Sequence, residues 1–204
     1  MTTGLSMDDA LNATGTGDIW LFRGPSKADK AIRAATNSPV NHVAITVALD
    51  DLPPLLWHTE LGHSLDDLWS GDRHRGAQLN LLSEALPVWI TSYGQRAFLR
   101  QLDAHVTREM EDGLLRVIER LDGRPFPRTT RLARFWLAGR FRKSVHMDTI
   151  YCAELTALSY QEMGLLERDR PANWFDPGRF WSGDRLPLTG SASLGPELEV
   201  KSPA

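Results

Sequence analysis

Hydrophobic and polar residues alternate along several short segments in the first half of the chain. This period of two is typical of β-strands. It predicts strands at 18–23, 42–48, 55–60, 76–81 and near 88–91. In 42–48 the side chains of His42 and Thr46 point to one side of the strand, and Val43 and Ile45 point to the other. A turn at 50–54 with two prolines predicts that 42–60 is a hairpin.

Helical spacing of apolar residues dominates the second half. Ser26 is placed to cap a short helix at 26–35, and longer helices are expected at 97–105, 108–121, 131–141 and 154–166. Residues 1–16 are polar and predicted to be flexible, 171–188 are rich in loops and aromatic residues, and 189–204 are predicted to form a disordered tail. Antiparallel strands followed by helices predict one α+β domain over 17–188.

The composition is that of a soluble globular domain. The chain has 204 residues, of which 42% are hydrophobic and 24% are charged. A net charge of −3 argues against general nucleic-acid binding. The sequence has no long apolar run and no signal-peptide pattern, so we expect a cytoplasmic protein.

The chain has one cysteine, Cys152, between a polar loop and an apolar-periodic helix. The free N–H groups and the dipole of a helix N-terminus stabilise an anion, so this thiol is expected to have a lowered pKa and thiolate character. A single cysteine accompanied by histidines elsewhere is a candidate nucleophile. The alternative is that Cys152 is a small buried core residue, as free cysteines often are.

Histidines are the candidate bases for this cysteine. His42 heads one strand of the hairpin, and His58 shares a face of the next strand with Glu60, so His58 or Glu60 can orient His42. The alternative is that each histidine is simply half-buried at a strand edge. Three further histidines, His63, His74 and His105, are expected at the surface. His146 lies six residues before Cys152 and is expected to line the site.

A set of motifs in a fixed order resembles a known family. The motifs are GDIWLF at 17–22, NHVAI at 41–45, LWH at 56–58, GAQL at 76–79, YCAEL at 151–155 and NWFDPGRF at 173–180. In this order they are similar to the circularly permuted NlpC/P60 superfamily, and more narrowly to the YiiX/YaeF-like permuted papain-fold cysteine hydrolases. The resemblance spans about residues 17–181. It implies an antiparallel sheet or barrel packed against helices, with the histidine before the cysteine in the chain.

The resemblance also implies roles for site residues. Cys152 matches the nucleophile and His42 the general base. The third, orienting position reads His58 where many members have a carboxylate, with Glu60 as the fallback. The implied activity is hydrolysis of an amide bond, of peptide or cell-wall type, through an acyl-enzyme. The backbone N–H of Cys152 is a natural oxyanion donor, and Tyr151 is either a site-lining or a core residue.

Two other functions remain open: a lipid acyltransferase or thioesterase using the same site, and an inactive papain-like binding module. Residues 124–143 contain no acid, and their arginines, including Arg131, Arg134 and Arg140, form either a peripheral membrane contact or a solvated helix face. We expect no metal and no cofactor, because His58 to His63 is not a metalloprotease motif and no cysteine pair exists. The expected substrate is a small-molecule, peptide or lipid acyl compound, and the oligomeric state is not predicted.

Overall fold

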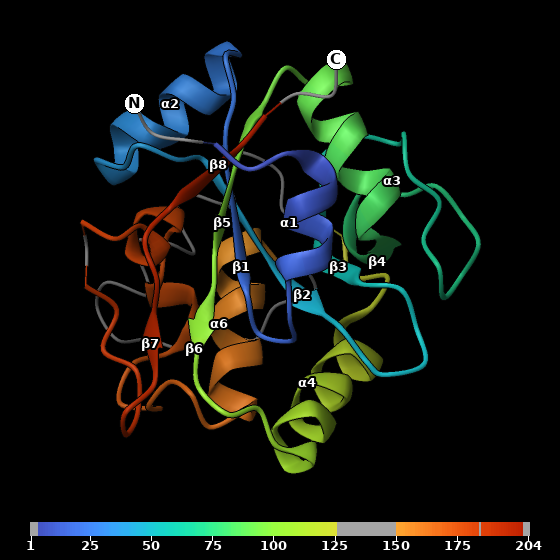
Figure 1. Cartoon of the computed structure of the whole chain (residues 1–204). Helices are drawn as coiled ribbons and strands as arrows, with labels where there is room; N and C mark the ends of the chain where they lie inside the picture. Colours follow the sequence, from blue (N-terminus) through green and yellow to red (C-terminus); the bar gives the residue numbers. More distant parts are fainter. Residues whose placement is uncertain (1–3, 126–149, 184, 202–204) are drawn as a thin grey trace.

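A central antiparallel sheet organises the chain (Figure 1). The computed structural model describes residues 4–125, 150–183 and 185–201. The sheet has six strands in the order β4-β3-β2-β1-β5-β8, and all neighbouring strands are antiparallel. Its strands are β1 (Ile19–Arg23), β2 (His42–Val47), β3 (Leu55–Glu60), β4 (Gly76–Leu81), β5 (Arg96–Arg100) and β8 (Leu198–Val200). A short ribbon pairs β6 (Leu102–Asp103) with β7 (Ser193–Leu194).

Helices cover both faces of this sheet (Figure 1). One face carries α4 (Arg108–Leu121) and α6 (Cys152–Glu162), and the other carries α1 (Met7–Ala13), α3 (Leu82–Pro87) and the π-helical turn η1 (Val88–Ser92). The remaining elements among the described residues are α2 (Lys27–Thr36) and the short 3₁₀ turns η2 (Ala172–Trp174) and η3 (Pro177–Phe180). The protein is therefore a mixed α+β structure with an antiparallel sheet packed on helices, as the sequence predicted.

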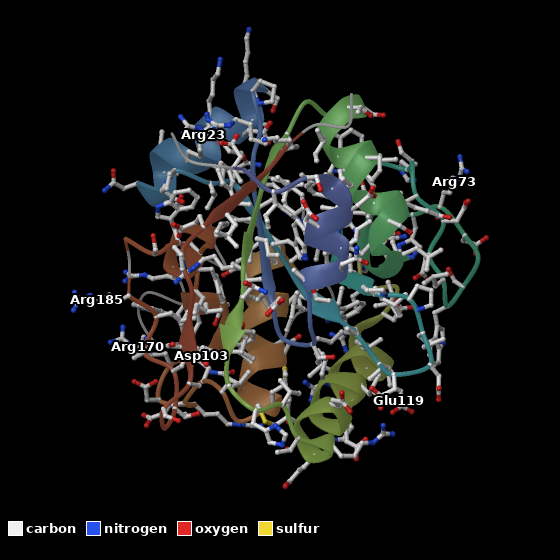
Figure 2. All side chains as sticks on the ribbon, in the orientation of Figure 1. Arg23, Arg73, Asp103, Glu119, Arg170 and Arg185 are labelled. Carbon is white, nitrogen blue, oxygen red and sulfur yellow. The ribbon has the colours of Figure 1, made fainter. Side chains whose placement is uncertain are left out.

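Strand alternation divides the core into two clusters, one on each face. On the α6 face, Val43 and Ile45 of β2 pack with residues of α6. On the α3 face, Ala44 of β2 packs with Trp20 and Trp89. Charged side chains such as Arg23, Arg73 and Glu119 lie at the periphery (Figure 2). Each side chain of the candidate site therefore lies on one of these two faces of the sheet.

Several predicted elements are confirmed almost to the residue. Strands β1 to β4 and helix α4 lie where the sequence placed them, and β2 and β3 form the expected hairpin. Helix α2 begins after Ser26, whose hydroxyl oxygen accepts the backbone N–H of Asp29, while the Asp29 carboxylate accepts the N–H of Ser26. This reciprocal capping box explains why the helix starts there.

Two predicted elements in the middle of the chain are wrong. Residues 97–105 were expected to be helical, but they contain β5, which lies between β1 and β8. The sequence of a strand that is buried on both faces is a continuous apolar run. The spacing of its apolar residues therefore does not distinguish it from a buried helix. Residues near 88–91 were expected to form a strand, but they form η1, which continues α3 and fully buries Trp89 against the sheet.

The predicted flexible ends are also corrected. Residues 7–13 form α1, whose N-cap is Ser6 and whose Ala10 is fully buried. Residues 198–200 form β8, which adds to β5, and Glu199 makes a salt bridge of 2.7 Å to Arg96. The two ends meet through a parallel bridge between Leu5 and Val200. Local composition does not reveal such pairing, because it joins residues almost 200 positions apart.

Candidate functional site

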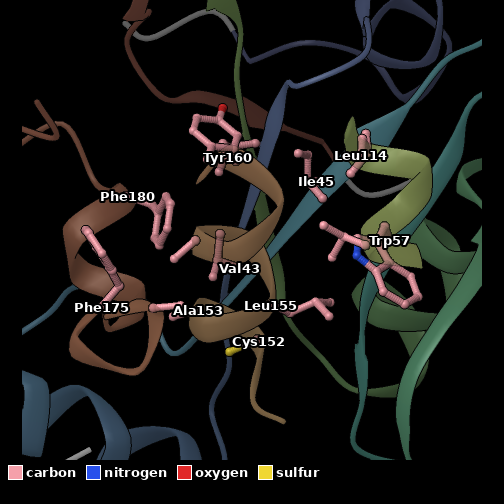
Figure 3. Close-up of a cluster of buried hydrophobic side chains, with 14 of the residues drawn as sticks. Val43, Ile45, Trp57, Leu114, Cys152, Ala153, Leu155, Tyr160, Phe175 and Phe180 are labelled. Carbon is pink, nitrogen blue, oxygen red and sulfur yellow. The ribbon is translucent and has the colours of Figure 1, made fainter. Parts of the chain in front are cut away.

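The thiol of Cys152 lies at the start of α6, against the sheet (Figure 3). Cys152 is the first helical residue, and no side-chain hydrogen bond caps the helix at Tyr151. The cysteine is only 5% exposed and belongs to the apolar cluster that contains Val43 and Leu155. The predicted placement at a helix N-terminus is therefore confirmed, but the thiol is buried.

Burial changes the acidity of this thiol in the direction opposite to the one expected. Loss of solvation raises the pKa of Cys152 to about 11, and the negative charge of Asp176 adds to the rise. The backbone N–H groups of Val43, Ala153 and Cys152 act in the opposite direction but do not compensate. The expected lowering of the pKa is wrong for this structure, because a helix terminus does not outweigh full desolvation.

The sulfur of Cys152 lies close to the start of β2. Among the described residues, β2 pairs with β3 only through residues 45–47, so the two strands part before they reach His42. The N–H of Val43 is directed at the Cys152 sulfur. The thiol is thus held next to the backbone of the residue that follows His42 in sequence.

The imidazole of His42 lies on the other face of the sheet. Its ring centroid is 4.3 Å from that of Trp89 and 5.7 Å from that of Phe22. Its Nε2 atom is buried and has no hydrogen-bond partner in the described part of the chain. Burial, followed by repulsion from His58, lowers the pKa of His42 well below its usual range, so the ring is neutral at pH 7. No hydrogen bond joins it to Cys152 among the described contacts.

The structure does bring His42, His58 and Glu60 to one face. The ring centroids of His42 and His58 lie 6.0 Å apart, and the rings are arranged edge to face. Burial lowers the pKa of His58, and the charge of Glu60 partly opposes this. The Oε1 atom of Glu60 accepts the Tyr93 hydroxyl at 2.8 Å and the N–H of Gly62 at 2.6 Å.

The remaining candidates lie elsewhere. The hydroxyl of Tyr151 donates to the carbonyls of Asn173 and Phe175 at 2.7 and 3.0 Å, so its side chain is in the core, one of the two placements expected. His63 and His105 are exposed as predicted, whereas His74 is half-buried, 3.7 Å from Asp67. Residues outside the described part of the chain include His146, Arg131, Arg134, Arg140 and the expected helix at 131–141.

Residues of β4 and η1 complete the polar face, and the sequence analysis missed them. Gln78 lies opposite His58 in the strand register, and Asn80 lies two positions further along the same face. The Oδ1 atom of Asn80 is 2.7 Å from Nε2 of His58. The alternation of polar Gln78 and Asn80 with apolar neighbours was a usable signal, since those side chains must share a face. Nothing in the sequence placed Trp89 beside His42.

The described residues contain no group of three histidine, cysteine, aspartate or glutamate side chains arranged to hold a metal ion. In the same described residues, no helix combines the length and the apolar character needed to cross a membrane.

Comparison with known proteins finds similarity to five solved chains. A solved structure, the metalloprotein YiiX from Escherichia coli O157:H7, shares 21% sequence identity with this chain at a TM-score of 0.49. The alignment covers 73% of this chain and 66% of that one. No family model and no curated protein matches the sequence.

Proposed function

We propose that the protein is a cysteine-dependent hydrolase that cleaves an amide bond, in a peptide or cell-wall-type substrate, through an acyl-enzyme. The observation that carries the proposal is the placement of Cys152 at the start of α6, beside the N–H of the residue that follows His42. The ordered motifs of the sequence, which resemble those of the permuted NlpC/P60 superfamily, support the same assignment.

In this proposal Cys152 attacks as a thiolate formed during the reaction. With a thiol pKa of about 11 and a lowered imidazole pKa, both groups are neutral at rest. His42 takes the thiol proton as the sulfur attacks the carbonyl carbon, and it gives that proton to the nitrogen as the C–N bond breaks. Water, deprotonated by His42, then attacks the thioester and releases a carboxylic acid and the free thiol.

For this reaction the side chain of His42 has to change its orientation. At rest its ring is stacked on Trp89, on the opposite face of the sheet from α6. We infer that the side chain of His42, the first residue of β2, turns toward the sulfur where β2 and β3 part beside Val43. His58, whose ring centroid lies 6.0 Å from that of His42 at rest, is then the candidate partner of His42, with Glu60 next to it on β3.

A second function, an inactive scaffold that binds without catalysis, is favoured by one specific observation. The buried thiol has a raised pKa and is not hydrogen-bonded to His42 among the described contacts, so the resting structure has no preformed Cys–His pair. Such a protein would bind an acyl compound without cleaving it.

Acylation by p-nitrophenyl acetate distinguishes the two functions. The hydrolase is expected to release p-nitrophenol in a burst and to gain one acetyl group on the peptide containing Cys152, measured by mass spectrometry. The acetyl group should then be lost over further turnovers. Absence of the adduct at neutral pH, in folded protein treated with excess ester, would support the scaffold and overturn the proposal.

A further inference from the structure

The hydrogen bonds of Asn80 determine which ring nitrogen of His58 carries the proton. The Nδ2 group of Asn80 donates to the carbonyl of Asp66 at 2.8 Å, which fixes the orientation of the amide. Its Oδ1 atom therefore faces Nε2 of His58 at 2.7 Å. A carbonyl oxygen only accepts hydrogen bonds, so the proton of neutral His58 is on Nε2 and the lone pair is on Nδ1.

The lone pair on Nδ1 of His58 lacks a partner, and so does one nitrogen of His42. Both Nδ1 of His58 and Nε2 of His42 are buried without a hydrogen bond. Leaving a buried polar atom without a partner is costly, so a bond between these two atoms is favoured once the rings turn toward each other. Because Nδ1 of His58 can only accept, Nε2 of His42 must donate, which leaves the lone pair of His42 on Nδ1.

We propose that Asn80 is a positioning residue that acts through His58 to keep the proton of His42 on Nε2. The free Nδ1 of His42 is then the atom that takes the proton of Cys152. This inference rests on the proposed function for its catalytic meaning. The tautomer of His58 itself is a property of the folded protein and is measured without substrate.

Other groups around His58 define the controls. Gln78 is fully buried, lies opposite His58, and has no hydrogen-bond partner for either amide atom among the described residues. It is the alternative donor to Nδ1 of His58. Burial lowers the pKa of His58, while the charges of Glu60 and Asp67 raise it. The ring centroid of Trp89 lies 5.4 Å from that of His58.

The test is a long-range ¹H–¹⁵N correlation spectrum of the histidine rings in the ¹⁵N-labelled protein. Wild-type His58 is expected in the Nε2–H form at pH 7. Asn80→Leu should raise the share of the Nδ1–H form above that of the wild type, whereas Asn80→Asp should retain Nε2–H and make His58 titrate at higher pH. Gln78→Met, the matched control, should leave the tautomer unchanged.

Each outcome decides the inference. An Nδ1–H form in the wild type, an unchanged tautomer in folded Asn80→Leu, or a change in Gln78→Met equal to that in Asn80→Leu would overturn it. If Asn80→Leu does not fold, the wild-type spectrum and the titration of Asn80→Asp decide.

Should the protein hydrolyse esters, Asn80→Leu is expected to lower kcat by at least about 10-fold with little change in KM, and Asn80→Asp is expected to recover part of the lost kcat. A confirmed tautomer without any acylation of Cys152 would instead disprove the proposed function alone.

Discussion

Cys152→Ala is expected to reduce hydrolysis of an acyl substrate by about 10⁴-fold or more, to the background rate of the remaining site. The alanine keeps the helix start and removes only the sulfur, which belongs to the apolar cluster that contains Val43 and Ala153. The measurement is the steady-state rate with N-acyl p-nitroanilides and p-nitrophenyl esters, because these report cleavage of amide and ester bonds separately.

The control for this variant is a measurement of its stability against unfolding. The side chain of Cys152 packs in the apolar cluster, so its truncation is expected to cost only about 1 kcal/mol in the free energy of unfolding. Thermal unfolding of wild-type and variant protein should therefore show cooperative transitions a few degrees apart. A folded Cys152→Ala protein that retains its hydrolysis rate would show that another residue is the nucleophile.

Glu154→Gln is expected to stabilise the protein at neutral and alkaline pH by about 2–4 kcal/mol. Glu154 lies in the first turn of α6, and burial raises the pKa of its carboxyl to about 8, opposed by the N–H of Tyr151 and the charge of Arg124. Folding therefore favours the protonated acid. The wild type loses stability as pH rises from about 4.5, where the unfolded chain ionises, to about 8, where the folded protein does.

The measurement is urea unfolding of both proteins at pH 4 and at pH 8.5. At pH 4 the carboxyl is protonated in both states, so the two proteins should have similar free energies of unfolding. At pH 8.5 the difference should reach its full value. An equal difference at the two pH values would mean that the effect comes from packing and not from ionisation of Glu154.

The alternation of polar and apolar residues was sufficient to predict the strands in which polar side chains recur on one face. β2, β3 and β4 alternate clearly, and α4 has an apolar stripe over its whole length. The same patterns failed for β5, which is buried on both faces, and for α1 and β8, which are held by contacts between the two ends of the chain. Those contacts depend on the tertiary structure, which short-range periodicity does not encode.

The candidate site was predictable in part for the same reason. Alternation along the hairpin correctly placed His42, His58 and Glu60 on one face. It gave no information about which face α6 covers, and the structure places Cys152 on the opposite one. The raised pKa of the thiol follows from that packing. Alternation marked Asn80 as part of a polar face, but its contact with His58 follows from the register of β3 and β4 in the structure.

Whether Cys152 acts with His42 is measured by the pH dependence of Cys152 alkylation by iodoacetamide in wild type and His42→Ala. His105→Ala, at an exposed histidine, is the control. We expect wild-type alkylation near pH 7 to be at least about 10-fold faster than in His42→Ala, because the imidazole accepts the thiol proton. The two rates should converge near pH 11, where the buried thiol ionises on its own. Identical profiles for wild type and His42→Ala at every pH would show that His42 does not act on the thiol, and would leave Cys152 as a core residue of a binding scaffold.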